Sequence, residues 1–176
     1  MSKISILRGG ILAAVLATLV AVIATPQAAQ ASGQSPYVRK GSYCIFVPSG
    51  SEGTALVMGG CGLVGTMKRQ DTSRTYNGHP LIFVRYGEES GPPYPYCLDN
   101  LGQASGQVRD YRCNGGSYQQ LEVFDVGSGK KVLKSLGAYL GNGRHLCLSA
   151  GTTKNAALVW ATCNTAASTQ QFNWNP

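Results

Sequence analysis

The stretch "CLDNLGQASGQVRDYRC", residues 97–113, indicates the fold, because a second stretch repeats its frame further along the chain. "CLSAGTTKNAALVWATC", residues 147–163, has the same length, opens with the same Cys-Leu and also ends in cysteine. A third pair, Cys44 and Cys61, lies about 50 residues before the first, and a period of this length is the signature of an internal repeat. The sequence therefore predicts three copies of one structural unit.

The six cysteines are expected to form three disulfides. Sequence alone allows many pairings, but three equivalent pairs are most simply three bridges within repeats. The predicted bridges are Cys44–Cys61, Cys97–Cys113 and Cys147–Cys163. Each would stabilise the fold by roughly 3 kcal/mol in the chain-entropy model. Zinc binding is the alternative for paired cysteines, but the short Cys-x-x-Cys spacing that favours it is absent.

The N-terminus reads as a secretory signal peptide covering residues 1–31. Two basic residues precede an apolar run from 11 to about 24, which is too short and too rich in alanine for a good membrane span. Ala29-Gln30-Ala31 has the small-x-small pattern of a cleavage site. The prediction is a secreted, extracellular chain from Ser32 to Pro176 with no membrane span. An uncleaved anchor is the alternative.

The charge pattern indicates which partners to expect. The formal net charge of the whole chain is +7, and removal of the signal lowers it to about +5. The basic residues are scattered, without a dense basic run among aromatic residues, so no nucleic-acid partner is expected. An acidic glycan or an anionic cell surface stays open as a partner.

Between the cysteines the sequence has the texture of an all-β protein. Short runs rich in Val, Leu, Ile and aromatic residues alternate with turns rich in Gly, Ser, Asn and Pro. Strands are expected within 54–58, 79–86, 107–113, 119–126, 130–136, 156–163 and 170–174. His79-Pro80 is expected to make a turn, and no stretch after the signal is long enough for a confident helix. Three such units, closed around a pseudo-threefold axis, would give a barrel without open edges.

The second repeat resembles the ricin-type β-trefoil lectin family. It carries the family's Cys-Leu-Asp opening at 97–99, its aromatic-x-Cys at 111–113, its Asn-Gly-Gly at 114–116 and its Gln strand at 119–121. The third repeat keeps this frame, whereas the first keeps its cysteines and little else. The resemblance implies an all-β fold, a β-trefoil with one disulfide per repeat. It implies one domain over 32–176, with repeats at approximately 40–90, 91–139 and 140–176.

Two departures from the family pattern concern the core. The family's tryptophan in the Gln strand is Leu121 in the second repeat and Phe172 in the third. A swap of one large apolar side chain for another keeps a core at some packing cost, so both are expected to be buried. Trp160 lies one place from the aromatic position of the third repeat and is also expected in the core.

The resemblance also implies one carbohydrate site, in the second repeat. The family's sugar contacts are an acid after Cys-Leu, an aromatic residue two places before the second cysteine, and an Asn before the Gln. Asp99 and Tyr111 match the first two, while Tyr118 replaces the Asn. Asp99 would accept hydrogen bonds from sugar hydroxyls and Tyr111 would stack on a sugar face, with both side chains at the surface. Gln119 and Asn114 are expected to assist, and a galactose-type sugar or a polysaccharide is the expected ligand.

The other repeats lack this pair of groups, with Phe46 and Gly59 in the first and Ser149 and Ala161 in the third. Other readings of the second repeat stay open. Asp99 could cap a turn and Tyr111 could be half-buried.

The chain would then be a β-trefoil protein-interaction module, such as an inhibitor or the cell-binding subunit of a multi-chain toxin, whose sugar sites are lost. The divergent stretch 63–96 points to a specialised surface in that case.

Catalysis is not expected. His79 and His145 are the only histidines, and no cysteine is expected to be free to pair with them. Asp99 and Asp110 could be imagined as a glycosidase pair, but nothing in the sequence indicates the separation or the shifted pKa that this chemistry requires. Arg109, Asp110 and Arg112 are expected to form weak surface pairs. No cofactor and no metal are expected.

Overall fold

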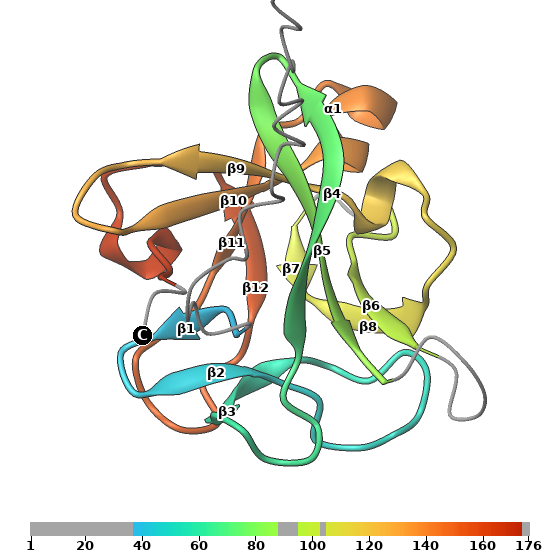
Figure 1. Ribbon diagram of the computed structural model, residues 1–176, viewed down its shortest axis with the longest axis vertical. Coiled ribbons are helices and arrows are strands. Elements are labelled where there is room, and N and C mark those ends of the chain that lie inside the picture. The colour runs from blue at the N-terminus through green and yellow to red at the C-terminus, as the bar shows by residue number, and fades with distance from the viewer. Residues whose placement is uncertain (1–36, 88–94, 103–104, 174–176) are drawn as a thin grey trace, which may run out of the picture. The chain divides into compact units, whose positions relative to one another are not determined.

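The computed structural model describes residues 37–87, 95–102 and 105–173 (Figure 1), so the predicted signal peptide lies outside the described residues. The regular secondary structure of the described part consists mainly of strands, as expected. The strands are β1 (Arg39–Lys40), β2 (Tyr43–Phe46), β3 (Val57–Gly60), β4 (Lys68–Tyr76), β5 (His79–Tyr86), β6 (Tyr96–Asp99), β7 (Gly106–Gln107), β8 (Arg109–Arg112), β9 (Leu121–Asp125), β10 (Lys131–Ser135), β11 (Leu146–Ser149) and β12 (Val159–Thr162). Short helical segments are α1 (Leu136–Asn142), η1 (Ser117–Gln119) and η2 (Ser168–Gln170).

A ring of three backbone hydrogen bonds marks the pseudo-threefold axis. The amide of Leu56 donates to the carbonyl of Val108, that of Val108 to Leu158, and that of Leu158 back to Leu56, over 2.9, 2.9 and 3.0 Å. All three side chains are fully buried. One residue from each repeat thus occupies an equivalent place in the ring, which confirms the expected arrangement of three packed repeats.

The three predicted disulfides are confirmed, one in each repeat. Cys44–Cys61, Cys97–Cys113 and Cys147–Cys163 each join residues 16 or 17 apart in sequence. Each bridge links a cysteine in the first strand of an antiparallel pair to the residue directly after the second strand, the pairs being β2 and β3, β6 and β8, and β11 and β12. No cysteine is free.

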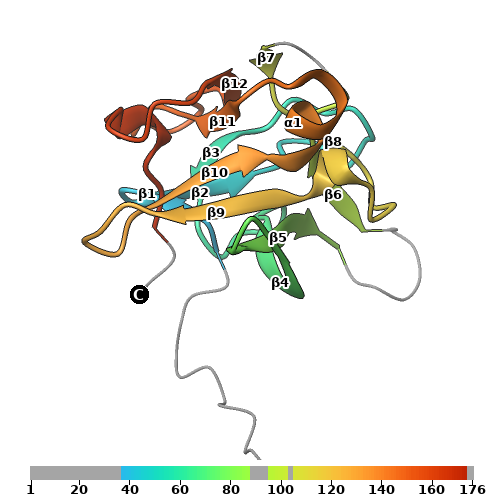
Figure 2. The same ribbon diagram turned by 90° about the horizontal axis from the view of Figure 1, so that it is seen from above.

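Pairing between repeats closes the barrel. β1, β2 and β3 form one sheet, and most other strands join a second sheet in the order β7-β12-β11-β10-β9-β5-β6-β8. β4 pairs only with β5, and Figure 2 shows β10, β9, β5 and β4 following one another in that order. Arg39 and Asn173 exchange backbone hydrogen bonds of 2.7 and 2.9 Å, which joins the first strand to the last repeat.

The core consists of residues from all three repeats, including Ile45, Leu98 and Leu148 next to the first cysteine of each. Leu121, Phe172 and Trp160 are at most 2% exposed, so their expected place in the core is confirmed. Leu and Phe therefore fill the positions that hold tryptophan in the family pattern.

The stretch after the first repeat differs from the prediction. β4 was not expected, because eight of its nine residues are polar or charged and none is fully buried, so it lacks apolar alternation. The turn lies at Asn77-Gly78, with φ values of 48° and 81°, and not at His79-Pro80, which belong to β5. Asn-Gly is the preferred dipeptide of a two-residue hairpin turn because both positions need positive φ.

The short helix α1 was not predicted either. The side chain of Ser135 accepts a hydrogen bond from the amide of Ala138 at its start, and Gly143 ends it in the left-handed conformation at φ 65°. Its glycines hide the apolar periodicity that usually reveals a helix in a sequence.

Candidate functional site

Asp99 and Tyr111 lie on the same face of the β6–β8 pair, as the carbohydrate-site prediction requires. Asp99 is opposite Arg109 in the antiparallel register, and Tyr111 is opposite Cys97. Because alternate residues of a strand point to opposite faces, these four side chains share one face.

The expectation that Asp99 lies at the surface is wrong. The residue is 5% exposed, and its Oδ1 accepts a hydrogen bond of 2.7 Å from the amide of Leu101. Leu101 has a φ of 51°, a left-handed conformation that is costly for leucine. Asp99 thus caps a tight turn, the role that the sequence left open as the alternative.

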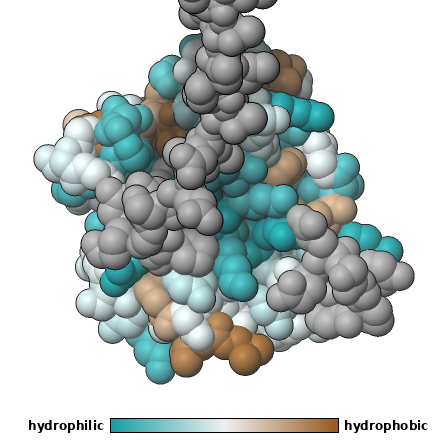
Figure 3. Space-filling model, viewed as in Figure 1, coloured by the Kyte–Doolittle hydropathy of each residue, from teal (hydrophilic) through white to brown (hydrophobic). Residues whose placement is uncertain are grey.

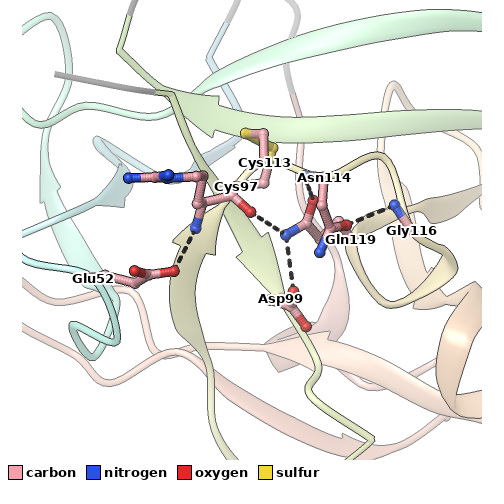
Figure 4. The surroundings of a disulfide bond; sticks show 8 residues. Glu52, Cys97, Asp99, Cys113, Asn114, Gly116 and Gln119 are labelled. Carbon is pink, nitrogen blue, oxygen red and sulfur yellow. Dashed lines mark hydrogen bonds between the residues drawn. A yellow bond between two sulfur atoms is a disulfide. The ribbon is translucent and has the colours of Figure 1, made fainter. Parts of the chain in front are cut away.

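Gln119 joins Asp99 to the loop after the disulfide (Figure 4). Its Nε2 donates to Oδ2 of Asp99 and to the carbonyl of Arg112, both over 2.9 Å, while its Oε1 accepts from the amide of Asn114 over 2.8 Å. Oδ1 of Asn114 in turn accepts from the amide of Gly116 over 2.8 Å. Asp99 and buried Gln119 therefore fix the position of the loop 114–116.

The same frame recurs where no sugar contacts are expected. In the third repeat, Nε2 of Gln170 donates to the carbonyl of Thr162 and its Oε1 accepts from the amide of Asn164, both over 2.8 Å. In the first repeat the hydroxyl of Thr66 donates to the carbonyl of Gly60 over 3.0 Å. The hydrogen bonds of Gln119 to the loop after the disulfide therefore belong to the scaffold, because Gln170 makes the same bonds in the third repeat. Sequence analysis did not identify Thr66 as the counterpart of Gln119 and Gln170, because a hydroxyl group takes the place of their side-chain amide.

The face of Tyr111 is partly covered by a loop from the first repeat. The side chain is half-buried, and its hydroxyl lies close to Gly53, where an added Cβ would be 3.5 Å away. Arg109 Nη1 donates to the carbonyl of Gly53 over 2.7 Å, and Glu52 Oε1 accepts from the amide of Arg112 over 3.1 Å (Figure 4). These contacts join the first repeat to β8 of the second repeat.

Tyr118 fills the place of the family's asparagine with a ring that holds α1. A Cβ on Gly137 would lie 2.3 Å from its ring, and one on Gly141 would lie 2.4 Å from its hydroxyl. The helix backbone therefore contacts the tyrosine directly, and only glycine fits at these two positions. Tyr118 acts as a packing residue.

In the first repeat an aromatic residue fills the corresponding cleft. The Phe46 side chain lies over Gly59, where an added Cβ would be 2.5 Å from the ring, and against Gly65. Phe46 occupies the position of Asp99 and Gly59 that of Tyr111. The first repeat thus has neither the acid nor an open cleft.

A hollow lies beside the Cys97–Cys113 disulfide, against the hairpin of β4 and β5. It comprises two adjoining cavities of about 190 and 500 Å³ that share Gln70, Phe83 and Gly115. We call it the hairpin groove. Its other lining residues are Asp71, Thr72, Ser73, Arg74, Arg85, Cys97, Cys113 and Asn114. Asn114 is the one predicted carbohydrate-binding residue that lines it. Sequence analysis missed the wall formed by residues 70–74 because it did not recognise β4.

An irregularity in β4 aims several successive side chains at this groove. The pairing of β4 with β5 shifts register between Asp71 and Thr75, and the hydroxyl of Thr72 donates to the carbonyl of Leu81 over 2.7 Å. In a regular strand the residues 71–74 would alternate between faces, yet all four line the groove. The bulge thus concentrates polar groups on one wall.

Asp110 is fully buried, so its expected place in a weak surface pair is wrong. It is opposite Leu98 and points to the face away from Asp99. Neither carboxylate oxygen has a hydrogen-bond partner, and burial raises the pKa of this carboxyl to about 6, with a smaller contribution from Glu52.

Among residues 37–87, 95–102 and 105–173, no group of three or more His, Cys, Asp or Glu side chains is arranged to hold a metal ion. In the same part of the chain, no helix is long and apolar enough to cross a membrane.

Comparison with known proteins supports the fold. No protein-family model matches the sequence, and no curated protein matches it. Among solved structures, the designed threefold-symmetric protein ThreeFoil superposes with a TM-score of 0.61 at 18% identity, over 82% of this chain and 99% of that one. The described chain is a β-trefoil.

Two larger proteins contain a similar part. A mosquitocidal holotoxin matches with a TM-score of 0.61 at 14% identity, over 81% of this chain and 16% of the toxin. The exo-β-1,3-galactanase 1,3Gal43A from Clostridium thermocellum matches with a TM-score of 0.60 at 14% identity, over 82% of this chain and 30% of the enzyme. The chain thus spans less than a third of either protein. At these identities the likeness shows the fold alone.

Proposed function

We propose that the chain is a secreted, non-catalytic carbohydrate-binding module whose ligand lies in the hairpin groove, between the β4–β5 hairpin of the first repeat and the disulfide of the second. Secretion is supported by the signal-like N-terminus and by three disulfides, which persist in oxidising compartments. A sugar ligand is supported by the resemblance to the ricin-type repeat and by the occurrence of this fold within a galactanase.

The observation that carries the proposal is the composition of the groove. Phe83 is half-buried and lines both cavities, so part of its side chain borders the hollow, and the amide groups of Gln70 and Asn114 lie around it. Sugar rings stack their carbon-bound hydrogens on aromatic rings while amides bind their hydroxyls. Asp99 offers less to a ligand, because its carboxylate is buried and accepts hydrogen bonds from Leu101 and Gln119.

In this proposal the four predicted residues have different roles. Asn114 contacts ligand directly, whereas Asp99 and Gln119 are positioning residues that hold the loop 114–116 against the groove. Tyr111 flanks the disulfide on the opposite strand from Cys97 and contributes packing with Gly53.

The absence of catalysis is supported by the direction of the two candidate acids. Asp99 and Asp110 point to opposite faces of the β6–β8 pair and are both buried. Glycoside hydrolysis needs two carboxyl groups flanking one bond, which this arrangement does not allow.

Titration of the protein with galactose, galactan oligosaccharides and tetragalacturonate, followed by calorimetry, tests the proposal. A shallow site of this size should bind with a dissociation constant on the order of millimolar. Phe83→Ala should weaken binding about tenfold through the lost stacking surface. Phe124→Ala, which removes a similarly half-buried aromatic ring of β9, is the matched control and should leave affinity unchanged. Equal losses in both variants, or no binding by any sugar, would refute the proposal.

A protein-binding role is the second candidate, favoured by an exposed apolar loop. Leu63 and Val64 are 60% and 88% exposed, and they border a hollow of about 390 Å³ together with Tyr37, Tyr86 and Lys68. Figure 3 shows an apolar patch at the lower edge of the molecule, where the loop between β3 and β4 lies. Loss of partner binding in a Leu63→Ser, Val64→Ser protein with unchanged sugar affinity would support this role.

A further inference from the structure

The charges around the hairpin groove indicate what kind of sugar it takes. β4 and β5 carry four basic residues, Lys68, Arg69, Arg74 and Arg85, against the single acid Asp71. Asp71 Oδ2 lies 3.0 Å from Nη2 of Arg69, so its charge is balanced within β4. The hairpin is thus strongly cationic, and Figure 3 shows hydrophilic residues gathered over β4.

Arg74 is the cation best placed to meet a ligand. It is exposed, it lines the larger cavity, and within the described residues it has no acidic partner. The bulge between Asp71 and Thr75 brings it to the groove wall, where the hydroxyl of Thr72 accepts a hydrogen bond of 3.2 Å from its amide. Arg85 lines the smaller cavity, which Phe83 also lines.

A groove lined by an aromatic residue and two arginines fits a sugar that carries negative charge. A guanidinium offers a planar fork of donors that matches a carboxylate or a sulfate, and such charge-assisted bonds are roughly twice as strong as neutral ones. The groove residues Gln70, Ser73 and Asn114 carry polar groups suited to the sugar hydroxyls.

We propose that the hairpin groove binds an anionic oligosaccharide, a uronate or a sulfated sugar, with Arg74 and Arg85 as the residues that recognise its charge. This inference rests on the proposed carbohydrate-binding function and adds the ligand class. The positive net charge, about +5 once the predicted signal with Lys3 and Arg8 is removed, favours the approach of such a ligand.

A matched pair of ligands tests it. Tetragalacturonate and its methyl ester have the same backbone, but only the first is charged. We expect tetragalacturonate to bind at least tenfold more tightly at low salt, and this difference should shrink as the salt concentration rises. Isomaltotetraose and its sulfated form distinguish sulfate from carboxylate recognition in the same way.

Two variants assign the effect to the groove. Arg74→Gln should weaken tetragalacturonate binding about tenfold and leave the methyl ester unchanged, because only the charged contact is lost. Arg144→Gln removes an exposed arginine that lines a different hollow, so it is the matched control and should change neither. Thermal unfolding of each variant verifies that the fold is intact.

The outcomes separate the two proposals. Equal binding of the acid and its ester at the groove would overturn the anionic specificity while leaving the carbohydrate function intact. Binding of a single-stranded oligonucleotide as tight as that of tetragalacturonate would also overturn it, because the groove would then be a general polyanion site. No binding of any of these sugars would refute both.

Discussion

Substitution of Asp110 by asparagine should remove a pH dependence of stability that the fold itself creates. The carboxyl group is fully buried, and this burial raises its pKa from 3.8 to about 6 although nearby backbone amides oppose the shift. A shift of this size corresponds to about 3 kcal/mol between the two protonation states. The folded protein therefore holds this proton more tightly than the unfolded chain.

This difference in proton binding sets the direction in which stability changes with pH. The stabilisation from protonated Asp110 is complete below about pH 4, the pKa of the unfolded chain, and is lost as the pH rises through about 6. In the Asp110→Asn protein this decrease of stability with rising pH should be absent. The free energy of unfolding of the variant, relative to that of the wild type, should rise by about 3 kcal/mol between pH 4 and pH 8. The buried amide itself can lower the stability of the variant by about 1–3 kcal/mol at every pH.

Urea unfolding of the disulfide-intact protein at several values between pH 4 and pH 8 measures this slope. Asp125→Asn is the control, because Asp125 is exposed and its hydrogen bond with Lys131 lowers the pKa of its carboxyl. That variant should change the pH dependence in the opposite direction and only weakly. Parallel stability curves for wild type and Asp110→Asn across this range would refute the reasoning.

Three further predictions concern the scaffold. Replacement of both Cys147 and Cys163 by alanine should cost roughly 2–5 kcal/mol in urea unfolding; a smaller loss would show that the bridge adds little. Gly78→Ala should cost about 1 kcal/mol through its φ of 81° alone, since nothing lies within 4 Å of an added Cβ; no loss in thermal unfolding would contradict the turn geometry. Asp99→Ala should cost about 1–3 kcal/mol and shift the amide resonance of Asn114, whereas Ser149→Ala at the equivalent place should leave that resonance unchanged. An unmoved Asn114 signal in the Asp99 variant would mean that Asp99 does not position the loop.

The fold could be predicted from the sequence because its determinants recur at fixed spacing. The three cysteine pairs fix the repeat, and the Cys-Leu and Gln positions of the second and third repeats fix equivalent strands. The resemblance implied that Asp99 and Tyr111 belong to one site, and the structure places both on the same face of the β6–β8 pair.

The site could be predicted only in part, because burial and grooves depend on contacts between distant segments. Asp110 is buried beneath a loop of the first repeat, whose Gly53 and Thr54 pair with its backbone, and no local pattern reveals this. The wall formed by β4 was missed because its polar residues lack strand periodicity, although the Asn77-Gly78 dipeptide was available as a hairpin signal.

Two-dimensional NMR of the isotope-labelled protein, titrated with tetragalacturonate, tests the central claim most directly. The account predicts that perturbed amide signals cluster at Gln70, Arg74, Phe83 and Asn114, on both walls of the hairpin groove. Signals that cluster instead in the third repeat, around Ser149, or at the loop of Leu63 would contradict it.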